Sequence, residues 1–475
     1  MRKNANRTAS VSITEFSKKG NGIGTTLNQN GEPWKVEVPF TIPGDTAEAL
    51  LLRKRGGLFG SLLQQITIPA PTRIAPKCKH FSVCGGCRWQ QIPYTEQLQN
   101  KEEMVRRYFG DLITPDVAFH PIIPCGSPWQ YRNKMEFSFS SDAAKTKYLG
   151  LIIDASGGKV VNLTECHLVN PWFIEALEAT RAWWEGSDLE AYHIRQNTGS
   201  LRTLTVREGK RTGDRMVMLT VSGNPDYALH RPQINSFLAA IRKAIEPPDP
   251  DCHLSVFLRI HQIAKGIPTN FYEMHLYGPD HIKETLLITT IAGKEPIPLT
   301  FTISPSAFFQ PNSSQAEKLY SLALQHAAIP QDAVAYDLYC GTGTLGICMA
   351  KHAKQVIGIE ISPESALDAR TNATSNGIEN FTVYTGAVHE ILKNKEFPKP
   401  DLLMIDPPRV GLEVAGCEQI IALGAPSIVY ISCNPATQAV DVAELVKHGY
   451  RLVSIQPVDQ FPQTIHIENI ALLVK

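Results

Sequence analysis

The alternation of helical and strand-like patterns over residues 315–475 constrains the fold of this chain most. Apolar periodicity predicts helices at 315–327, 343–352, 362–376, 387–393 and 435–447, and strands at 333–338, 355–360, 380–385, 401–405 and 427–431, followed by two closing strands. Such alternation is typical of a doubly wound parallel sheet. We therefore expect an α/β, Rossmann-like domain that binds its ligand at the carboxyl edge of the sheet.

The segments before residue 300 have more strand-like patterns than the α/β region. Residues 8–70 contain five short alternating strands separated by glycine-rich turns, which predicts a small β-barrel of the OB type. Residues 130–300 alternate strand-like segments with one clear helix near 171–185, which predicts a central α+β domain. The expected domains are 1–70, 71–300 and 301–475, and a helical segment within 94–124 is expected to pack on the last of them.

Charge is distributed unevenly. The chain holds 46 basic and 46 acidic residues, yet residues 1–80 hold twelve Lys or Arg and only five acids. A basic module of this kind favours an RNA-binding barrel, although an ordinary solvated surface is the alternative. A run of about 18 apolar residues and a signal-peptide pattern are both missing, so we expect a cytoplasmic protein without a membrane segment.

A glycine-rich turn follows the first strand of the α/β region. Residues 337–346 end a strand and open a helix, and Glu360 ends the next strand. Glycines let the backbone approach a ligand, and an acid at the second strand tip binds the hydroxyls of a ribose. The pattern that begins at Gly341 also matches a nicotinamide-binding turn. However, Asp406-Pro407-Pro408 at the fourth strand end favours S-adenosylmethionine. Methyltransferases of amines and amides carry an aromatic residue where this chain has Arg409.

Two further residues suggest covalent chemistry. Cys433 lies between a strand and a helix, where we expect the helix N-terminus to lower the thiol pKa; a small buried side chain is the alternative. Glu468 lies in an apolar closing strand, where burial raises the pKa of a carboxyl group and suits it to general-base work; a partnered buried acid is the alternative.

A thiolate, a carboxylate and a methyl donor are sufficient to methylate uracil. Thiolate attack on carbon-6 makes carbon-5 nucleophilic enough to take a methyl group, and a base then removes the carbon-5 proton so that the cysteine is released. The target base must leave its stack to reach these groups.

Seven segments together resemble the RNA (uracil-5-)-methyltransferase family, most closely the bacterial 23S rRNA enzymes with an iron–sulfur cluster. They are Cys78, Cys84 and Cys87, and residues 131–134, 308–312, 337–343, 406–409, 432–435 and 461–468. The resemblance implies that residues 8–70 form a TRAM domain, that Cys433 is the nucleophile and that Glu468 is the base. It further implies an S-adenosylmethionine site with these members: Gln310, Tyr339, Thr344, Glu360 and Asp406.

Cys78, Cys84 and Cys87 have the spacing C-x5-C-x2-C and require a fourth ligand. Cys166 is the preferred candidate and Cys125 the second. Four thiolates serve zinc and iron–sulfur clusters equally. The resemblance favours a [4Fe–4S] cluster with a structural or RNA-contacting role.

The same resemblance places Arg132, Asn133 and Lys134 in an RNA-contact segment. Phe308 and Phe309 are candidates for stacking on a base, with core packing expected for at least one of them. A 23S rRNA uridine is the favoured target, and the T-loop uridine of tRNA is the alternative. An amine or amide methyltransferase and a non-catalytic RNA-binding protein are more distant interpretations. A monomer suffices for this chemistry.

Overall fold

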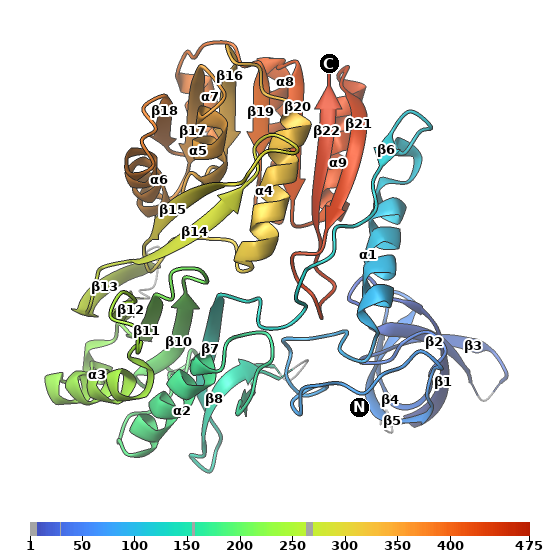
Figure 1. The fold of residues 1–475 in the computed structure, drawn as a ribbon. Coiled ribbons are helices and arrows are strands. Elements are labelled where there is room, and N and C mark those ends of the chain that lie inside the picture. Colours follow the sequence, from blue (N-terminus) through green and yellow to red (C-terminus); the bar gives the residue numbers. More distant parts are fainter. Residues whose placement is uncertain (1–6, 29, 154–156, 263–268) are drawn as a thin grey trace. The chain divides into compact units, whose positions relative to one another are not determined.

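A computed structural model describes residues 7–28, 30–153, 157–262 and 269–475 (Figure 1). The chain divides into two compact units. Unit 1 comprises Met1–Asn100, Leu151–Val161 and Phe461–Ile465, and unit 2 comprises Lys101–Gly150, Asn162–Gln460 and His466–Lys475. The three predicted domains stay a prediction, and residues 1–6 of the predicted barrel segment lie outside the described residues.

Unit 1 contains a closed five-stranded barrel with the strand order β1-β2-β3-β5-β4. Its strands are β1 (Arg7–Phe16), β2 (Gly22–Leu27), β3 (Pro33–Val38), β4 (Thr46–Arg55) and β5 (Leu58–Ile68). Small and branched side chains such as Val11, Val36 and Ala47 fill the interior. Gly24 lies so close to the Ser12 carbonyl oxygen that a Cβ there would overlap it. The barrel predicted from alternating patterns is therefore present and consistent with an OB-like domain.

A seven-stranded sheet follows, with the order β13-β12-β11-β10-β7-β8-β9. Its strands are β7 (Lys134–Ser141), β8 (Lys147–Ile152), β9 (Val160–Asn162), β10 (Leu201–Glu208), β11 (Arg215–Ser222), β12 (Leu254–Gln262) and β13 (Asn270–Tyr277). Helices α2 (Trp172–Glu185) and α3 (Arg231–Ile245) lie along one face, as Figure 1 shows.

The C-terminal sheet has eight strands in the order β18-β17-β16-β19-β20-β22-β21-β6. Its strands are β16 (Val334–Leu338), β17 (Gln355–Glu360), β18 (Phe381–Thr385), β19 (Leu402–Ile405), β20 (Ser427–Ser432), β21 (Arg451–Val458), β22 (Glu468–Val474) and the short β6 (Ala118–Phe119). Neighbours from β18 to β20 pair in parallel, whereas β22 is antiparallel to both β20 and β21. The Rossmann-like prediction is confirmed, with the reversed strand β22 inserted between β20 and β21.

Helices flank this sheet on both faces (Figure 1). They are α4 (Ser313–Ala327), α5 (Thr344–Ala350), α6 (Pro363–Ser375), α7 (Val388–Asn394), α8 (Glu413–Leu423) and α9 (Pro435–Lys447). The predicted helix within 94–124 is α1 (Tyr94–Phe109), followed by a 3-10 turn at Gly110–Leu112; a second such turn lies at Pro225–Tyr227. Val105 and Phe109 of α1 are buried in the same apolar cluster as β16 and β19. Sequence patterns missed α8. In the described ranges, no helix is long and apolar enough to cross a bilayer.

One apolar core runs through most of unit 2. Met216, Met218 and Phe257 of the seven-stranded sheet are buried in the same cluster as helix α4. The hairpin of β14 (Ile282–Ile288) and β15 (Ile297–Ile303) contributes Leu286 and Phe301 to that cluster. This shared core explains why most of the seven-stranded sheet and the C-terminal sheet belong to one compact unit.

Candidate active site

The glycine-rich turn after β16 has the backbone conformation that its sequence predicts. Tyr339, Gly341 and Gly343 all have positive φ values, of 67°, 54° and 82°. The N–H groups of Tyr339 and Cys340 donate to the Ile359 carbonyl at 3.0 and 3.1 Å. These bonds hold the turn against the end of β17, so its position is set by the sheet.

Glu360 is fixed beside this turn. One carboxylate oxygen accepts the Gly341 N–H at 2.9 Å and the other accepts the Ser362 N–H at 2.8 Å. Each oxygen retains a further lone pair. The carboxylate can therefore accept two ribose hydroxyls without rearranging, as predicted for an S-adenosylmethionine site.

Asp337 is a buried acid at the same edge. Its Oδ2 accepts the Gly346 N–H at 2.6 Å, and its Oδ1 has no hydrogen-bond partner among the described residues. Burial raises the pKa of Asp337 to about 8, and the charges of Asp406 and Glu360 act in the same direction. A concentration of carboxyl groups of this kind suits a cationic ligand.

We predict that Gly346→Ala destabilises the domain by about 1–3 kcal/mol, the range for an overpacked core. An added Cβ would overlap the Phe381 ring and lie 2.9 Å from Asp337 Oδ2. Denaturant unfolding measures the change. Gly126→Ala is the control, because no described atom lies within 4 Å of its added Cβ. Equal stability of the two variants would contradict the prediction.

Cys433 lies between β20 and α9 and is half-buried. The pKa of its thiol is raised to about 12 by burial, then by Glu468 and Asp406; Arg409 acts in the opposite direction. The expected lowering by the helix N-terminus is therefore wrong for this state, because burial and two nearby carboxyl groups outweigh it. The same interactions show that these groups are gathered at one place.

Glu468 is the first residue of β22 and only 2% exposed, and its Oε2 has no partner within the described ranges. Burial raises its pKa well above the usual value, and Asp406 adds to this effect. Burial likewise raises the pKa of Asp406, which follows β19, to about 7. The predicted direction for Glu468 is thus the one found, in a coupled pair of acids.

The loop after Asp406 is tied to the loop that carries Cys433. Asn434 Nδ2 donates to the Arg409 carbonyl at 2.9 Å, and Thr437 Oγ1 donates to the same carbonyl at 3.3 Å. The Arg409 guanidinium also donates to His466 Nδ1 at 3.2 Å. These bonds join the loop after Asp406 to the segments that carry Cys433 and Glu468.

Gln310 precedes α4 and is buried beside this site. Its Oε1 accepts from Gln460 Nε2 at 3.3 Å. Tyr320 of α4, which sequence reasoning missed, hydrogen-bonds to Gln310. Burial raises the pKa of Tyr320 well above its usual value, and Asp406 and Glu468 add to the shift. The apolar periodicity of α4 indicated that Tyr320 is buried but not which groups it faces.

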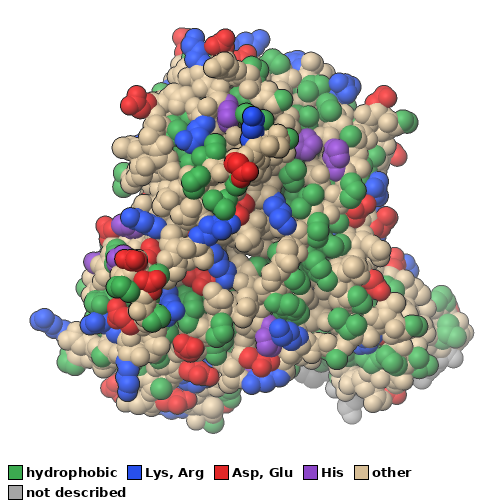
Figure 2. All heavy atoms as spheres, viewed as in Figure 1, with side chains coloured by type: hydrophobic (Ala, Val, Ile, Leu, Met, Phe, Trp, Pro, Cys, Tyr) green, Lys and Arg blue, Asp and Glu red, His purple; other side chains and the backbone are tan. Residues whose placement is uncertain are grey.

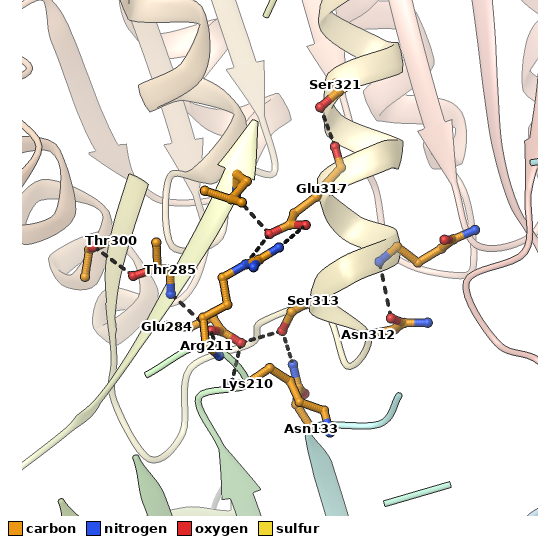
Figure 3. Close-up of polar contacts among 12 residues, drawn as sticks. Asn133, Lys210, Arg211, Glu284, Thr285, Thr300, Asn312, Ser313, Glu317 and Ser321 are labelled. Carbon is orange, nitrogen blue, oxygen red and sulfur yellow. Dashed lines mark hydrogen bonds and ion pairs between the residues drawn. The ribbon is translucent and has the colours of Figure 1, made fainter. Parts of the chain in front are cut away.

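Asn133 has a different place from the one predicted. Its side chain is 1% exposed and donates to the Gln310 carbonyl and to Ser313 Oγ, both at 2.9 Å. Figure 3 shows this contact continuing to Glu284, which accepts from Ser313 Oγ at 2.6 Å. The structure therefore leaves Asn133 no exposed surface for RNA and makes it an anchor for the start of α4.

The remaining predicted residues vary in exposure. Arg132 and Lys134 are half-buried, and Phe308 is 61% exposed. Phe309 is buried against Phe301, so one phenylalanine of the pair is in the core, as expected. Thr344 opens α5 and is buried. The Tyr339 hydroxyl lies close to Gly416 of α8, where an added Cβ would be 3.2 Å away.

Three of the predicted metal-ligand cysteines belong to unit 1, and Cys166 belongs to unit 2. Burial raises the pKa of Cys84, the charge of Cys78 adds to this effect, and the Gly86 N–H donates to Cys84 Sγ at 3.4 Å. Two thiols therefore lie near each other. The described residues contain no group of three His, Cys, Asp or Glu side chains arranged to hold a metal ion. The four-cysteine ligand set stays a prediction.

Comparison with known proteins agrees with this geometry. Residues 275–475 match the family described as tRNA (uracil-5-)-methyltransferase. An uncharacterized RNA methyltransferase of Protochlamydia amoebophila is 55% identical over 442 residues, covering 92% of this chain and 99% of its own. An uncharacterized RNA methyltransferase of Porphyromonas gingivalis is 34% identical over 490 residues, covering 98% of this chain and 99% of its own.

A solved structure shares the fold. The tRNA (uracil-54, C5)-methyltransferase of Pyrococcus abyssi, in complex with S-adenosyl-L-homocysteine, superposes with a TM-score of 0.71 at 24% identity, covering 98% of this chain and 100% of that one. The extent of the sequence relationships and the described site lead to one conclusion: this chain belongs to the RNA (uracil-5-)-methyltransferase family and is a methyl-transferring enzyme.

Proposed function

We propose that this enzyme uses S-adenosylmethionine to methylate carbon-5 of a uridine in 23S rRNA through a covalent bond between Cys433 and carbon-6. The observation that carries the proposal is the gathering of Cys433, Glu468 and Asp406 at the carboxyl edge of the sheet. This edge is where open α/β sheets bind ligands. An amine or amide methyltransferase has no need of a cysteine there.

The residues present fit the methyl donor. Glu360 offers free lone pairs for ribose hydroxyls, and the nearby carboxyl groups of Asp337, Asp406 and Glu468 support the binding of a cationic sulfonium at this edge. Gln310 belongs to the same site because it hydrogen-bonds to Tyr320, which interacts with Asp406 and Glu468. Bound S-adenosylmethionine supplies the methyl group; the protein's part is to activate uracil and to move protons.

The proton steps follow from the environment of Cys433. Its thiol is protonated in the free site, so Asp406, the acid that ionises at about pH 7, accepts that proton as sulfur bonds to carbon-6. The electron pair that this places on carbon-5 takes the methyl group. Glu468, after releasing its own proton to solvent, removes the carbon-5 proton, the carbon–sulfur bond breaks, and the thiolate leaves with its electron pair and takes its proton back from Asp406.

We predict that the single-turnover rate rises with pH through about 7. The pKa of Asp406 is raised to about 7 by burial. Below that pH the acid pair is protonated and cannot accept a proton from Cys433; above it, one carboxylate is available. Rates measured between about pH 5 and 9 test this, and Asp406→Asn should remove the ascending limb. A flat profile in the parent enzyme would contradict it.

A tRNA uridine is the second candidate target. The Pyrococcus abyssi enzyme with the same fold is named for uridine 54 of tRNA, and the family match carries a tRNA description. The superposition covers 98% of this chain and 100% of that tRNA enzyme. The barrel of this chain is therefore not by itself a reason to favour rRNA over tRNA. Mapping 5-methyluridine in rRNA and tRNA from cells lacking the gene decides between them. Loss confined to tRNA would overturn the rRNA assignment.

We further propose that residues 8–70 form a TRAM domain and that Cys78, Cys84, Cys87 and Cys166 bind a [4Fe–4S] cluster, with zinc the less favoured metal. The closeness of Cys78 and Cys84 supports a shared ligand, and the cluster takes no step in methyl transfer. Protein purified without oxygen should show visible absorption and acid-labile sulfide, and Cys84→Ser should reduce both. Stoichiometric zinc without sulfide would contradict the cluster.

A further inference from the structure

Two buried amides join the segments that carry Cys433 and Glu468. Gln438 lies near the start of α9, the helix that follows Cys433, and Asn469 directly follows Glu468 in β22. Both amide residues are fully buried. Asn469 Nδ2 donates to Gln438 Oε1 at 2.7 Å. The proton steps described above use neither side chain, so this pair needs a separate explanation.

Gln438 also bonds to the two strands that end at the site. Its Nε2 donates to the Tyr430 carbonyl of β20 at 2.8 Å and to the Asn469 carbonyl of β22 at 3.3 Å. A single side chain therefore joins α9 to both strands. Because α9 begins directly after Cys433, its position on the sheet also sets the position of Cys433.

The strand register relates this amide pair to the catalytic candidates. Strands β20 and β22 are antiparallel, and Ser432 pairs with Asn469. Continuing the register by one residue puts Cys433 opposite Glu468, and opposite residues share a face of the sheet. Consecutive residues point to opposite faces. Asn469 therefore lies on the α9 face, directly behind the face that carries Cys433 and Glu468.

Amides are costly at these positions. The residues of β22 after Asn469 are all apolar, and Asn469 Oδ1 has no hydrogen-bond partner in the part of the chain that the structure describes. A buried polar atom without a partner costs free energy, and an apolar pair of the same shape would be as stable or more so. What the amides supply instead is direction, because hydrogen bonds fix one arrangement and apolar contacts tolerate small shifts.

Charge pairs on the surface do not supply the same precision. In the view of Figure 2, Lys and Arg side chains are interspersed with Asp and Glu side chains. Solvent weakens such pairs, and long side chains lose entropy when one geometry is imposed on them. The buried bonds between Gln438 and Asn469 are therefore better suited to hold two catalytic groups at a set separation.

This separation matters most after sulfur has bonded to carbon-6. The uracil ring is then fixed to Cys433, and Glu468 must reach the proton on the neighbouring carbon-5. Before that bond forms, the base can settle against Cys433 wherever the thiol lies. A misplacement of about 1 Å can slow a reaction roughly 100-fold. Proton removal is therefore the step that depends most on the distance between the two side chains.

We propose that Gln438 and Asn469 are positioning residues that set the separation of Cys433 from Glu468, and that proton removal from carbon-5 depends on them more than adduct formation does. The inference rests on the proposed function, because it assigns the control of one of its steps. It expects a substitution on the α9 face of the sheet to slow one chemical step on the other face.

The test measures the two steps separately. The rate of trapping by RNA that contains 5-fluorouridine reports adduct formation, and tritium release from uridine labelled at carbon-5 reports proton removal. Asn469→Leu and Gln438→Met nearly conserve side-chain volume. Each should slow tritium release by about 10- to 100-fold and change the trapping rate by less than about threefold. Rate constants are compared, because unfolded molecules lower only the amplitude.

A double variant separates positioning from stability. Gln438→Met with Asn469→Leu leaves neither amide side chain without its partner, so denaturant unfolding should show much of the stability lost in the single variants restored. Tritium release should stay slow. Asn380→Leu is the matched control, because Asn380 Nδ2 donates to the Ala350 and Ala353 carbonyls at 2.8 and 2.9 Å before the start of β18. This control should release tritium at the parental rate.

Three results would overturn the proposal: parental tritium release in both single variants, equal slowing of trapping and release, or recovery of both stability and release in the double variant. An equal loss in Asn380→Leu would overturn it as well. A parent enzyme that RNA with 5-fluorouridine fails to trap would refute the covalent mechanism itself, and the inference with it.

Discussion

Glu468→Gln will accumulate RNA covalently attached to the protein, whereas Cys433→Ala will form no attachment and lose about 10⁴-fold or more in kcat. The amide cannot remove the carbon-5 proton, so the methylated adduct has no route to elimination. Glu468 is well placed for this role because it is buried with one carboxylate oxygen that lacks a partner in the described chain. Denaturing electrophoresis of mixtures with radiolabelled RNA measures the adduct.

The controls separate chemistry from folding. Cys417→Ala changes a buried cysteine in α8 and should keep the parental rate. RNA containing 5-fluorouridine should trap the parent enzyme and the Cys417 variant but not Cys433→Ala, because fluorine cannot leave as a proton does. A Cys433→Ala variant with full activity would refute the covalent mechanism.

Lys101→Ala will lower the free energy of unfolding by about 3–5 kcal/mol, the cost of leaving a buried charge without its counterion. Lys101 Nζ lies 2.6 Å from Asp459 Oδ1, and neither side chain is exposed. The pKa of Lys101 is lowered by burial, while Asp459 opposes the shift, so the charged state depends on this partner.

Denaturant unfolding of single and double variants measures the coupling. Lys101→Met with Asp459→Leu should recover most of the loss, since the double variant leaves no isolated charge. The exposed pair Lys145–Glu190, at 3.3 Å, is the control, and Lys145→Ala should change stability by less than about 1 kcal/mol. A loss of that small size in Lys101→Ala would contradict the prediction.

Local patterns were sufficient for the elements of the α/β region and of the barrel. Strand and helix periods, glycine turns and Pro435 all depend on neighbouring residues, and the structure has them close to the expected bounds. Helix α8 was missed because residues 413–423 are mostly apolar and carry little helical periodicity. The direction of β22 was also missed, because strand pairing depends on residues far apart in the chain.

For the candidate site too, local sequence patterns indicated the residues but not their environments. Cys433, Asp406 and Glu360 are candidates because of their places at strand ends, and Glu468 because it is an acid in an apolar closing strand. The pKa of Cys433 could not be predicted locally, since it depends on burial and on acids from β19 and β22. Asn133 was misplaced for a related reason: a polar residue beside Arg132 and Lys134 reads as surface until its bonds to Gln310 and Ser313 are seen.

The sequence by itself determined the element order, the turn conformations and the chemical groups available at the carboxyl edge, because these depend on local backbone preferences and residue type. Only the tertiary structure decided which groups share an environment. The proximity of Asp406 to Glu468 and the burial of Tyr320 beside them join distant segments. Desolvation and Coulomb interactions act through space, so the ionisation of these groups is a property of the folded chain.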